Sequence, residues 1–284
     1  MSKKGFRREE LPRNEHALEL ALNRFAGSNI KAVEYRDIMA GVVLGQMLPD
    51  GCVVKGGTSM RLRFGPGRSR VTMDFDTSRR DDLDVYLKQL RERTERGWQG
   101  FTGEVLIRKQ SSPKDIPFEY VMQPLDVKLA YRHQPWCTVR LEVSHNELGD
   151  ADEVEHWDLP ADIVNIFTSL GFPAPNAIPL MPLPFQIAQK LHGLSSRGSN
   201  RARDLIDLQL LFAGAKVDLR ATASVCSRLF AYRKMHPWPP TISKGDGWDS
   251  LYDAQRGALP VLATAEDAVV WVNELIGRLS QCGR

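Results

Sequence analysis

The sequence predicts an α+β fold, with a mixed sheet and flanking helices over residues 1–155 and a mainly helical region over residues 156–284. Three observations support this prediction. Short strand-like runs alternate with amphipathic helices in the first part, and helical periodicity dominates after residue 184. The stretch between them, residues 160–184, is rich in proline and is expected to be a connector of turns and short extended pieces. A chain of 284 residues is long enough to bury a sizeable core.

The expected elements of the first part follow from apolar periodicity and from turn residues. Helices are expected at residues 14–25, 33–48, about 58–64 and 81–98. Strands are expected at residues 52–54, from residue 71 onward, and at 103–109, 118–132 and 138–144. Asn14 is the expected N-cap of the first helix. In the last strand the apolar side chains of Val139, Leu141 and Val143 alternate with polar ones, which places Glu142 on the polar side.

The second part is expected to be a set of helices joined by loops. The predicted helices cover residues 184–196, 201–212, 219–232 and 265–279. A tryptophan- and proline-containing segment at residues 237–240 and the stretch 245–252 predict a loop between the last two helices.

Composition narrows the class of protein. Hydrophobic residues make up 42% of the chain and charged residues 26%, as in ordinary globular proteins. No apolar run approaches the ~20 residues of a membrane span, and the basic N-terminus lacks the apolar segment of a secretory signal. The four cysteines are far apart, which favours reduced thiols over disulfides or zinc ligands. We therefore expect a cytoplasmic protein that is not embedded in a membrane.

A glycine-rich turn in the segment KGGTSMRLR, residues 55–63, is a candidate phosphate-binding site. Gly56 and Gly57 allow backbone N–H groups to approach an anion closely. The helix that follows adds its N-terminal dipole, and the hydroxyls of Thr58 and Ser59 can donate to phosphate oxygens. Lys55 precedes the turn and adds a positive charge. Alone, such a turn is more often a plain strand-to-helix connection.

Paired carboxylates follow in the segment TMDFD, residues 72–76. Asp74 and Asp76 are two residues apart on a predicted strand, so both side chains project to one face while Phe75 points into the core. Two or three carboxylates suffice to hold Mg²⁺, which keeps water and phosphate oxygens as its other ligands. Glu142 is the preferred third carboxylate, and Asp126 on the preceding strand is the alternative. The pair beside a phosphate-binding turn favours phosphoryl or nucleotidyl transfer.

Four blocks in this order, KGGTSMRLR, TMDFD, QIAQKLHGL and RARDLIDLQLL, resemble the AbiEii/MenT family of bacterial nucleotidyltransferase toxins, within the polymerase-β-like nucleotidyltransferase superfamily. The resemblance runs from about residue 53 to residue 211. It implies that Thr72 and Asp74 match the Ser-x-Asp pair of the family. It also implies that Lys190 and Asp207 match its later lysine and aspartate, so that the helical region completes the site.

The resemblance further implies an activity and its partners. The expected protein is the toxin of a toxin–antitoxin pair that transfers a nucleotide from an NTP, with Mg²⁺, to an RNA acceptor such as the 3′ end of tRNA. Asp74 and Asp76 would hold the metal ion, and Lys190 would neutralise phosphate charge. Asp204 could instead pair with Arg201 or Arg203. A charge on a buried Asp207 would be compensated if it faced Lys190.

Arginines between residues 61 and 80 are a candidate RNA-facing surface, since phosphate contacts position a nucleic acid without specifying its sequence. This segment contains an inserted loop at residues 65–68, which lengthens the interval between the glycine turn and Asp74. Two alternatives stay open. One is a transferase that nucleotidylates a protein or a small molecule, and the other is a non-catalytic relative that binds nucleic acid.

Overall fold

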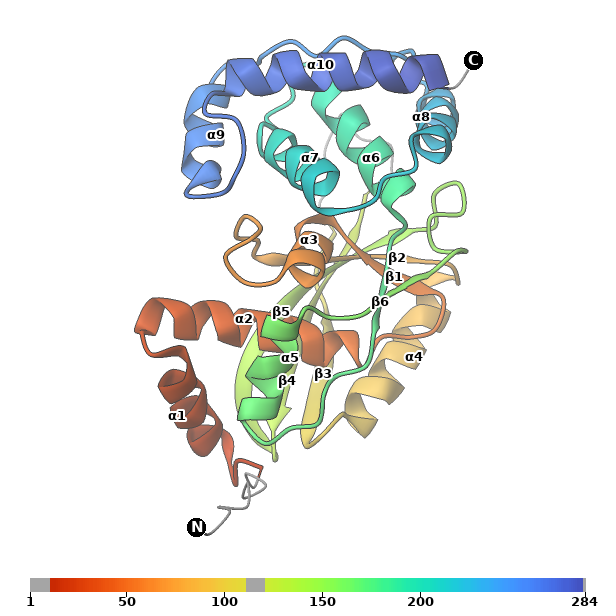
Figure 1. Cartoon of the computed structure of the whole chain (residues 1–284). Coiled ribbons are helices and arrows are strands. Elements are labelled where there is room, and N and C mark those ends of the chain that lie inside the picture. The colour runs from red at the N-terminus through yellow and green to blue at the C-terminus, as the bar shows by residue number, and fades with distance from the viewer. Residues whose placement is uncertain (1–10, 111–120, 283–284) are drawn as a thin grey trace.

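A computed structural model describes residues 11–110 and 121–282 of the chain (Figure 1). In this part of the chain, seven strands form one mixed sheet in the order β3-β4-β5-β2-β1-β7-β6. The strands are β1 (Cys52–Lys55), β2 (Asp74–Arg79), β3 (Phe101–Ile107), β4 (Gln123–Tyr131), β5 (Gln134–His145), β6 (Glu155–Trp157) and β7 (Ile178–Leu180). β2 runs parallel to β5 and antiparallel to β1, so the two central pairings differ in direction.

Helices cover the sheet on two sides. Those of the first part are α1 (Glu15–Ala26), α2 (Asn29–Gly45), α3 (Gly56–Phe64) and α4 (Leu83–Arg96), and α5 (Ala161–Ser169) lies in the connector. Those of the tail are α6 (Leu183–Ser195), α7 (Arg203–Gly214), α8 (Leu219–Arg233), α9 (Trp248–Arg256) and α10 (Ala265–Cys282). The tail helices gather at one end of the molecule, and α1 and α2 lie toward the other (Figure 1). The predicted α+β class, with a mixed sheet followed by helices, is confirmed.

Side chains along each strand point alternately to the two faces of the sheet, so each face packs against a different set of residues. Val54 and Phe75 pack on one face, in a core shared with apolar residues of α1, α2, α4 and α5. Val53 points to the other face and belongs to a second core, built mainly from the tail helices. Met60 of α3 also belongs to this second core. The sheet therefore serves two cores, and its second face lies toward the tail.

Several boundaries differ from the sequence-based prediction. The strand expected from Val71 begins at Asp74, so residues 71–73 lead into it without strand pairing. The expected connector contains helix α5, whose Ile163, Ile166 and Phe167 are buried at helical spacing. The expected loop at residues 245–252 contains helix α9, with Trp248 and Tyr252 buried one turn apart. The prolines and glycines that suggested loops flank these helices and do not lie inside them. Residues 118–120 of one predicted strand lie outside the described residues.

The segment after residue 155 contributes to the sheet. β6 and β7 pair with each other, and β7 runs parallel to β1. The side chains of Ile163 and Phe167 lie in the same core as Val54. The division of the chain at residue 155 stays a prediction. Among the described residues, no helix is both long enough and apolar enough to cross a membrane.

Candidate active site

Charged side chains occupy matching positions on three neighbouring strands. Lys55 on β1 is the register partner of Asp76 on β2, and Asp76 is the partner of Glu142 on β5. Residues directly opposite each other on paired strands project to the same face, so these three form a row across the sheet. Asp74 lies two residues before Asp76 and shares this face. The structure thus brings Asp74, Asp76, Glu142 and Lys55 together on the face that looks toward the tail.

The carboxylates of this row influence one another strongly. Burial raises the pKa of Asp76, and the charge of Asp74 raises it further, although Lys55, Lys190 and Arg201 act in the opposite sense. Burial, Asp76 and Asp74 likewise raise the pKa of Glu142. Burial is therefore the main reason that these two carboxylates resist ionisation, and their mutual repulsion adds to it. A bound cation would relieve this repulsion.

The register distinguishes Glu142 from Asp126 as neighbours of the acidic pair. Glu142 is directly opposite Asp76, whereas Asp126 on β4 is opposite Arg140 and one strand farther from β2. Asp126 also forms an ion pair of 3.7 Å with Arg108. This geometry favours Glu142 as the third carboxylate.

The donor set suits a hard divalent cation that brings further ligands with it. In the described part of the chain, no three His, Cys, Asp or Glu side chains are grouped so that they could hold a metal ion by themselves. Asp74 and Asp76 can nevertheless supply two carboxylates from one strand. Mg²⁺ is commonly bound in this way, by one or two carboxylates together with substrate phosphates and water.

The glycine turn lies against the acidic pair. Gly56 has a φ of +64°, and a Cβ atom at this position would overlap the Asp76 carboxylate. A Cβ atom on Gly57 would come within 2.8 Å of Thr72 Oγ1. Thr72 therefore lies beside the turn, next to Asp74. Both glycines are required because the segment that carries the carboxylates packs directly on them.

The two hydroxyls expected to bind phosphate have other partners. Thr58 Oγ1 donates to the backbone carbonyl of Asp74 at 2.7 Å, and Ser59 Oγ donates to that of Gly56 at 3.0 Å. Ser59 is fully buried and also accepts a hydrogen bond from Gln186 of α6 at 2.6 Å. Each hydroxyl has a single proton, so both hold the turn together in this structure. The backbone N–H groups at Gly56 and Gly57 are the better candidates for phosphate binding.

Replacing Gly56 by alanine is expected to destabilise the protein by about 1–3 kcal/mol, because an L-residue at positive φ is strained and its Cβ displaces Asp76. Nucleotide transfer should fall with it. Thermal unfolding and a transfer assay measure the two effects. Gly67→Ala is the matched control, because Gly67 also has positive φ but faces open space. Equal losses of activity in both variants would show that the contact with Asp76 is unimportant.

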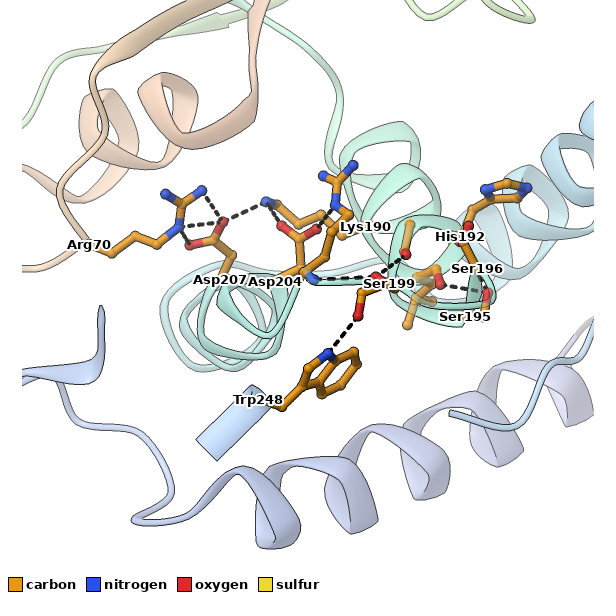
Figure 2. A network of polar contacts seen from close by, with 12 residues as sticks. Arg70, Lys190, His192, Ser195, Ser196, Ser199, Asp204, Asp207 and Trp248 are labelled. Atoms are coloured by element: carbon orange, nitrogen blue, oxygen red, sulfur yellow. Dashed lines mark hydrogen bonds and ion pairs between the residues drawn. The ribbon is translucent and has the colours of Figure 1, made fainter. Parts of the chain in front are cut away.

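A buried network of ions joins α6, α7 and the segment before β2 (Figure 2). Lys190 Nζ donates to Asp207 Oδ2 at 2.6 Å and to Asp204 Oδ1 at 2.9 Å. Asp207 is fully buried and also accepts hydrogen bonds from Arg70 Nε and Nη2 at 3.0–3.2 Å. Asp207 thus faces Lys190, which is the condition under which its buried charge is compensated. Lys190 keeps one N–H beyond these two partners.

Asp204 holds two cations at once. It binds Lys190 through one oxygen and Arg201 Nε through the other, the latter at 2.6 Å. Its pKa is held low by Lys190 and Arg201, which outweigh the effect of burial. Of the two arginines considered from the sequence, Arg201 is therefore the partner of Asp204. The pairing of Arg70 with Asp207 was not predicted from the sequence, because no local spacing links residues so far apart in the chain.

Of the arginines between residues 61 and 80 that are expected to face RNA, three are buried, whereas Arg68 and Arg80 are exposed, so the role of this segment toward RNA stays a prediction. Arg61, Arg63 and Arg70 are all buried. Arg63 forms a bidentate pair with Glu155 and donates to the carbonyl of Met181. Arg70 is bound to Asp207 as described above. Because Arg63 and Arg70 are buried against carboxylates, these two side chains do not contribute to an exposed basic surface.

Comparisons with known proteins identify the family of the chain. A family model described as nucleotidyl transferase AbiEii toxin, type IV toxin–antitoxin system, matches residues 15–269. MenT4, a nucleotidyltransferase toxin from Mycobacterium tuberculosis H37Rv, has a similar structure, with a TM-score of 0.51 and 18% identity over 93% of this chain and 98% of that chain. JHP933 from Helicobacter pylori has a TM-score of 0.44 and 17% identity over 89% of this chain and 93% of that chain. Among curated proteins, none matches the sequence.

The fold and the extent of the family match define the chain as a nucleotidyltransferase. It belongs to the AbiEii family of nucleotidyltransferase toxins of type IV toxin–antitoxin systems. An NTP is therefore its substrate, and an antitoxin is its counterpart.

Proposed function

We propose that this toxin transfers a nucleotide from an NTP to an RNA acceptor in a Mg²⁺-dependent reaction, and that the acceptor is the 3′ end of tRNA. The observation that carries the reaction type is the row of Asp74, Asp76 and Glu142 beside the glycine turn. This row places negative ligands for a metal ion next to backbone donors for phosphate. The RNA acceptor follows from the resemblance of the four sequence blocks to tRNA-modifying toxins.

Each group has a defined part in this proposal. Asp74 and Asp76 would hold Mg²⁺, which neutralises charge on the triphosphate and positions it for displacement. Lys55, the turn at Gly56 and Gly57, and Lys190 surround the phosphates with positive charge and N–H donors.

In the transfer step, a carboxylate of the chain accepts the proton of the acceptor hydroxyl, and pyrophosphate is the leaving group. The acceptor hydroxyl oxygen attacks the α-phosphorus and gives its proton to the Glu142 carboxylate. The bond from the α-phosphorus to the bridging oxygen breaks, and pyrophosphate leaves from the opposite side. The raised pKa of Glu142 makes this carboxylate a stronger base than an ordinary glutamate. Arg201 holds its guanidinium near Asp76, where it can assist Lys190 in offsetting phosphate charge.

Incubation of the purified protein with total RNA, Mg²⁺ and each of the four α-labelled NTPs tests the proposal. We expect label in RNA of tRNA size with the wild-type protein and none with Asp74→Ala. Asp84→Ala, which removes an exposed carboxylate of α4, should label RNA as the wild type does. Label in protein or in a small molecule instead of RNA would replace the RNA acceptor by the corresponding alternative. Equal labelling by Asp74→Ala would exclude the proposed metal-binding role.

A further inference from the structure

A cavity of about 500 Å³ opens beside Asp74, between α2, α3, the start of β2 and the middle of β5. Asp74 lines it, whereas Lys55, Asp76 and Lys190 do not. The lining includes Thr58 of the glycine-turn segment but no residue of the tail helices, so the cavity extends from Asp74 toward α2 and α3. Nothing in the proposed phosphate-binding arrangement uses it.

Arg61 of α3 is the unusual member of the cavity lining. Only 7% of this residue is exposed, yet within the described residues its guanidinium forms neither a hydrogen bond nor an ion pair. Asp37 and Glu34 act on it only at longer range, and burial lowers its pKa. The other two buried arginines of this segment, Arg63 and Arg70, each bind a carboxylate through two nitrogens.

A buried cation without a partner is unfavourable, because it loses its hydration and gains no hydrogen bonds in return. An unpaired guanidinium in a cavity wall is explained if its partner is an anionic ligand that the free protein lacks. A guanidinium matches a phosphate especially well, since its N–H groups can bind two oxygens at once.

Other residues that line the cavity could contact the sugar and base of a nucleotide as well as its phosphate. Arg108 and Arg140 also line the cavity; Arg108 is paired with Asp126, and Arg140 is the register partner of Asp74 across β2 and β5. The carboxylate of Asp37 belongs to the lining as well. Ile38, Phe75 and Val139 give an apolar wall. Met73, next to Asp74, is 74% exposed and also borders the cavity. A cavity of this size, lined by arginines and by apolar side chains, suits one nucleotide unit.

We infer that this cavity binds the terminal nucleotide of the RNA acceptor, with the Arg61 guanidinium on the phosphodiester that precedes the attacking hydroxyl. The inference rests on the proposed RNA transfer. In an in-line displacement the attacking and leaving oxygens lie on opposite sides of the α-phosphorus. With the triphosphate on the turn at Gly56 and on Lys190, the acceptor arrives from the other side of Asp74, where the cavity lies.

Arg61→Met is the direct test, because methionine keeps much of the length of the side chain and removes the charge. We expect the KM for the RNA acceptor to rise at least tenfold, with the Kd for NTP changed less than twofold. Binding of the dinucleoside monophosphate ApA, followed by NMR titration, should weaken to the same extent. The variant should melt at or above the wild-type temperature, because an unpaired buried charge has been replaced by an apolar group. Arg61→Lys, which keeps the charge, should recover part of the lost affinity.

Two further variants complete the experiment. Arg68→Met, on the same segment but exposed and paired with Asp162, should leave both constants unchanged. Arg140→Ala, on the exposed side of β5, should raise the KM for RNA even if Arg61→Met fails to fold. A comparable loss of NTP affinity in Arg61→Met, or unchanged RNA and ApA binding, overturns the inference and leaves the proposed RNA transfer intact. A wild-type protein that labels no RNA overturns both.

Discussion

Replacing Asp76 by asparagine is expected to lower the rate of nucleotide transfer at least ~10³-fold, while the protein stays folded. The amide cannot supply the negative charge that a metal ion between the carboxylates and the triphosphate requires, and a loss of about 4 kcal/mol of transition-state stabilisation corresponds to this factor. Asparagine has nearly the same shape as aspartate, so the packing on Gly56 is retained. Single-turnover assays at saturating NTP and Mg²⁺ measure the effect.

The same substitution is expected to stabilise the fold at neutral pH. The pKa of Asp76 is raised by burial and by Asp74, so the folded state binds a proton at this site more tightly than the unfolded state does. The stabilising contribution of Asp76 is thus present below the unfolded pKa and is lost as pH rises through the raised folded pKa. Asparagine avoids that loss, so its advantage over the wild type should appear above the folded pKa and vanish in acid.

Urea denaturation of both proteins at several pH values, without added divalent metal, measures this difference. Opposite changes in activity and stability would show that the acidic row is maintained for function at the expense of the fold. An Asp76→Asn protein that is less stable than the wild type at neutral pH would instead show that Lys55 and Lys190 make the ionised carboxylate favourable.

Replacing Asp207 by alanine is expected to destabilise the protein by about 3–5 kcal/mol, because it leaves Arg70 buried without a carboxylate partner. Lys190 loses one of its two acceptors in the same step. Since small proteins are stable by only about 5–15 kcal/mol, this change should be visible as a large drop in the urea midpoint. Transfer should be lost as well, because Lys190 is no longer held in place.

Asp162→Ala is the matched control for that effect. It removes the carboxylate partner of Arg68, two residues before Arg70, but both members of this pair are more than half exposed. Exposed pairs contribute about 0–1 kcal/mol, so this variant should unfold nearly as the wild type does. Similar midpoints for Asp162→Ala and Asp207→Ala would mean that the buried network contributes little to stability.

The row of Asp74, Asp76 and Glu142 was predictable from the sequence because it depends on the alternation of side chains within single strands. A two-residue spacing on a strand places Asp74 and Asp76 on one face, and alternation along the next polar strand places Glu142 on its polar side. The sequence could not decide between Glu142 and Asp126, since strand order is a property of the whole sheet. The register, with Asp76 opposite Glu142, favours one of them.

The burial of charged side chains was the feature that the sequence predicted least well. An arginine-rich stretch resembles a solvated basic surface, but Arg63 and Arg70 are buried against Glu155 and Asp207, more than ninety positions away. Long-range ion pairs of this kind have no signature in local spacing. Helix α9 was missed for a related reason, since its buried Trp248 and Tyr252 fill a core that other helices create.

The contact between Gln186 and the glycine turn bears on how the enzyme captures its substrate. Gln186 Nε2 donates to Ser59 Oγ and to the carbonyl of Gly56, so the helix that carries Lys190 is fastened to the turn expected to bind phosphate. Together with the pair of Arg70 and Asp207, this joins both halves of the site before any substrate arrives. The site is preorganised, so little binding energy is consumed in closing it. Capture of NTP should then proceed in one kinetic step, without a slow rearrangement after encounter.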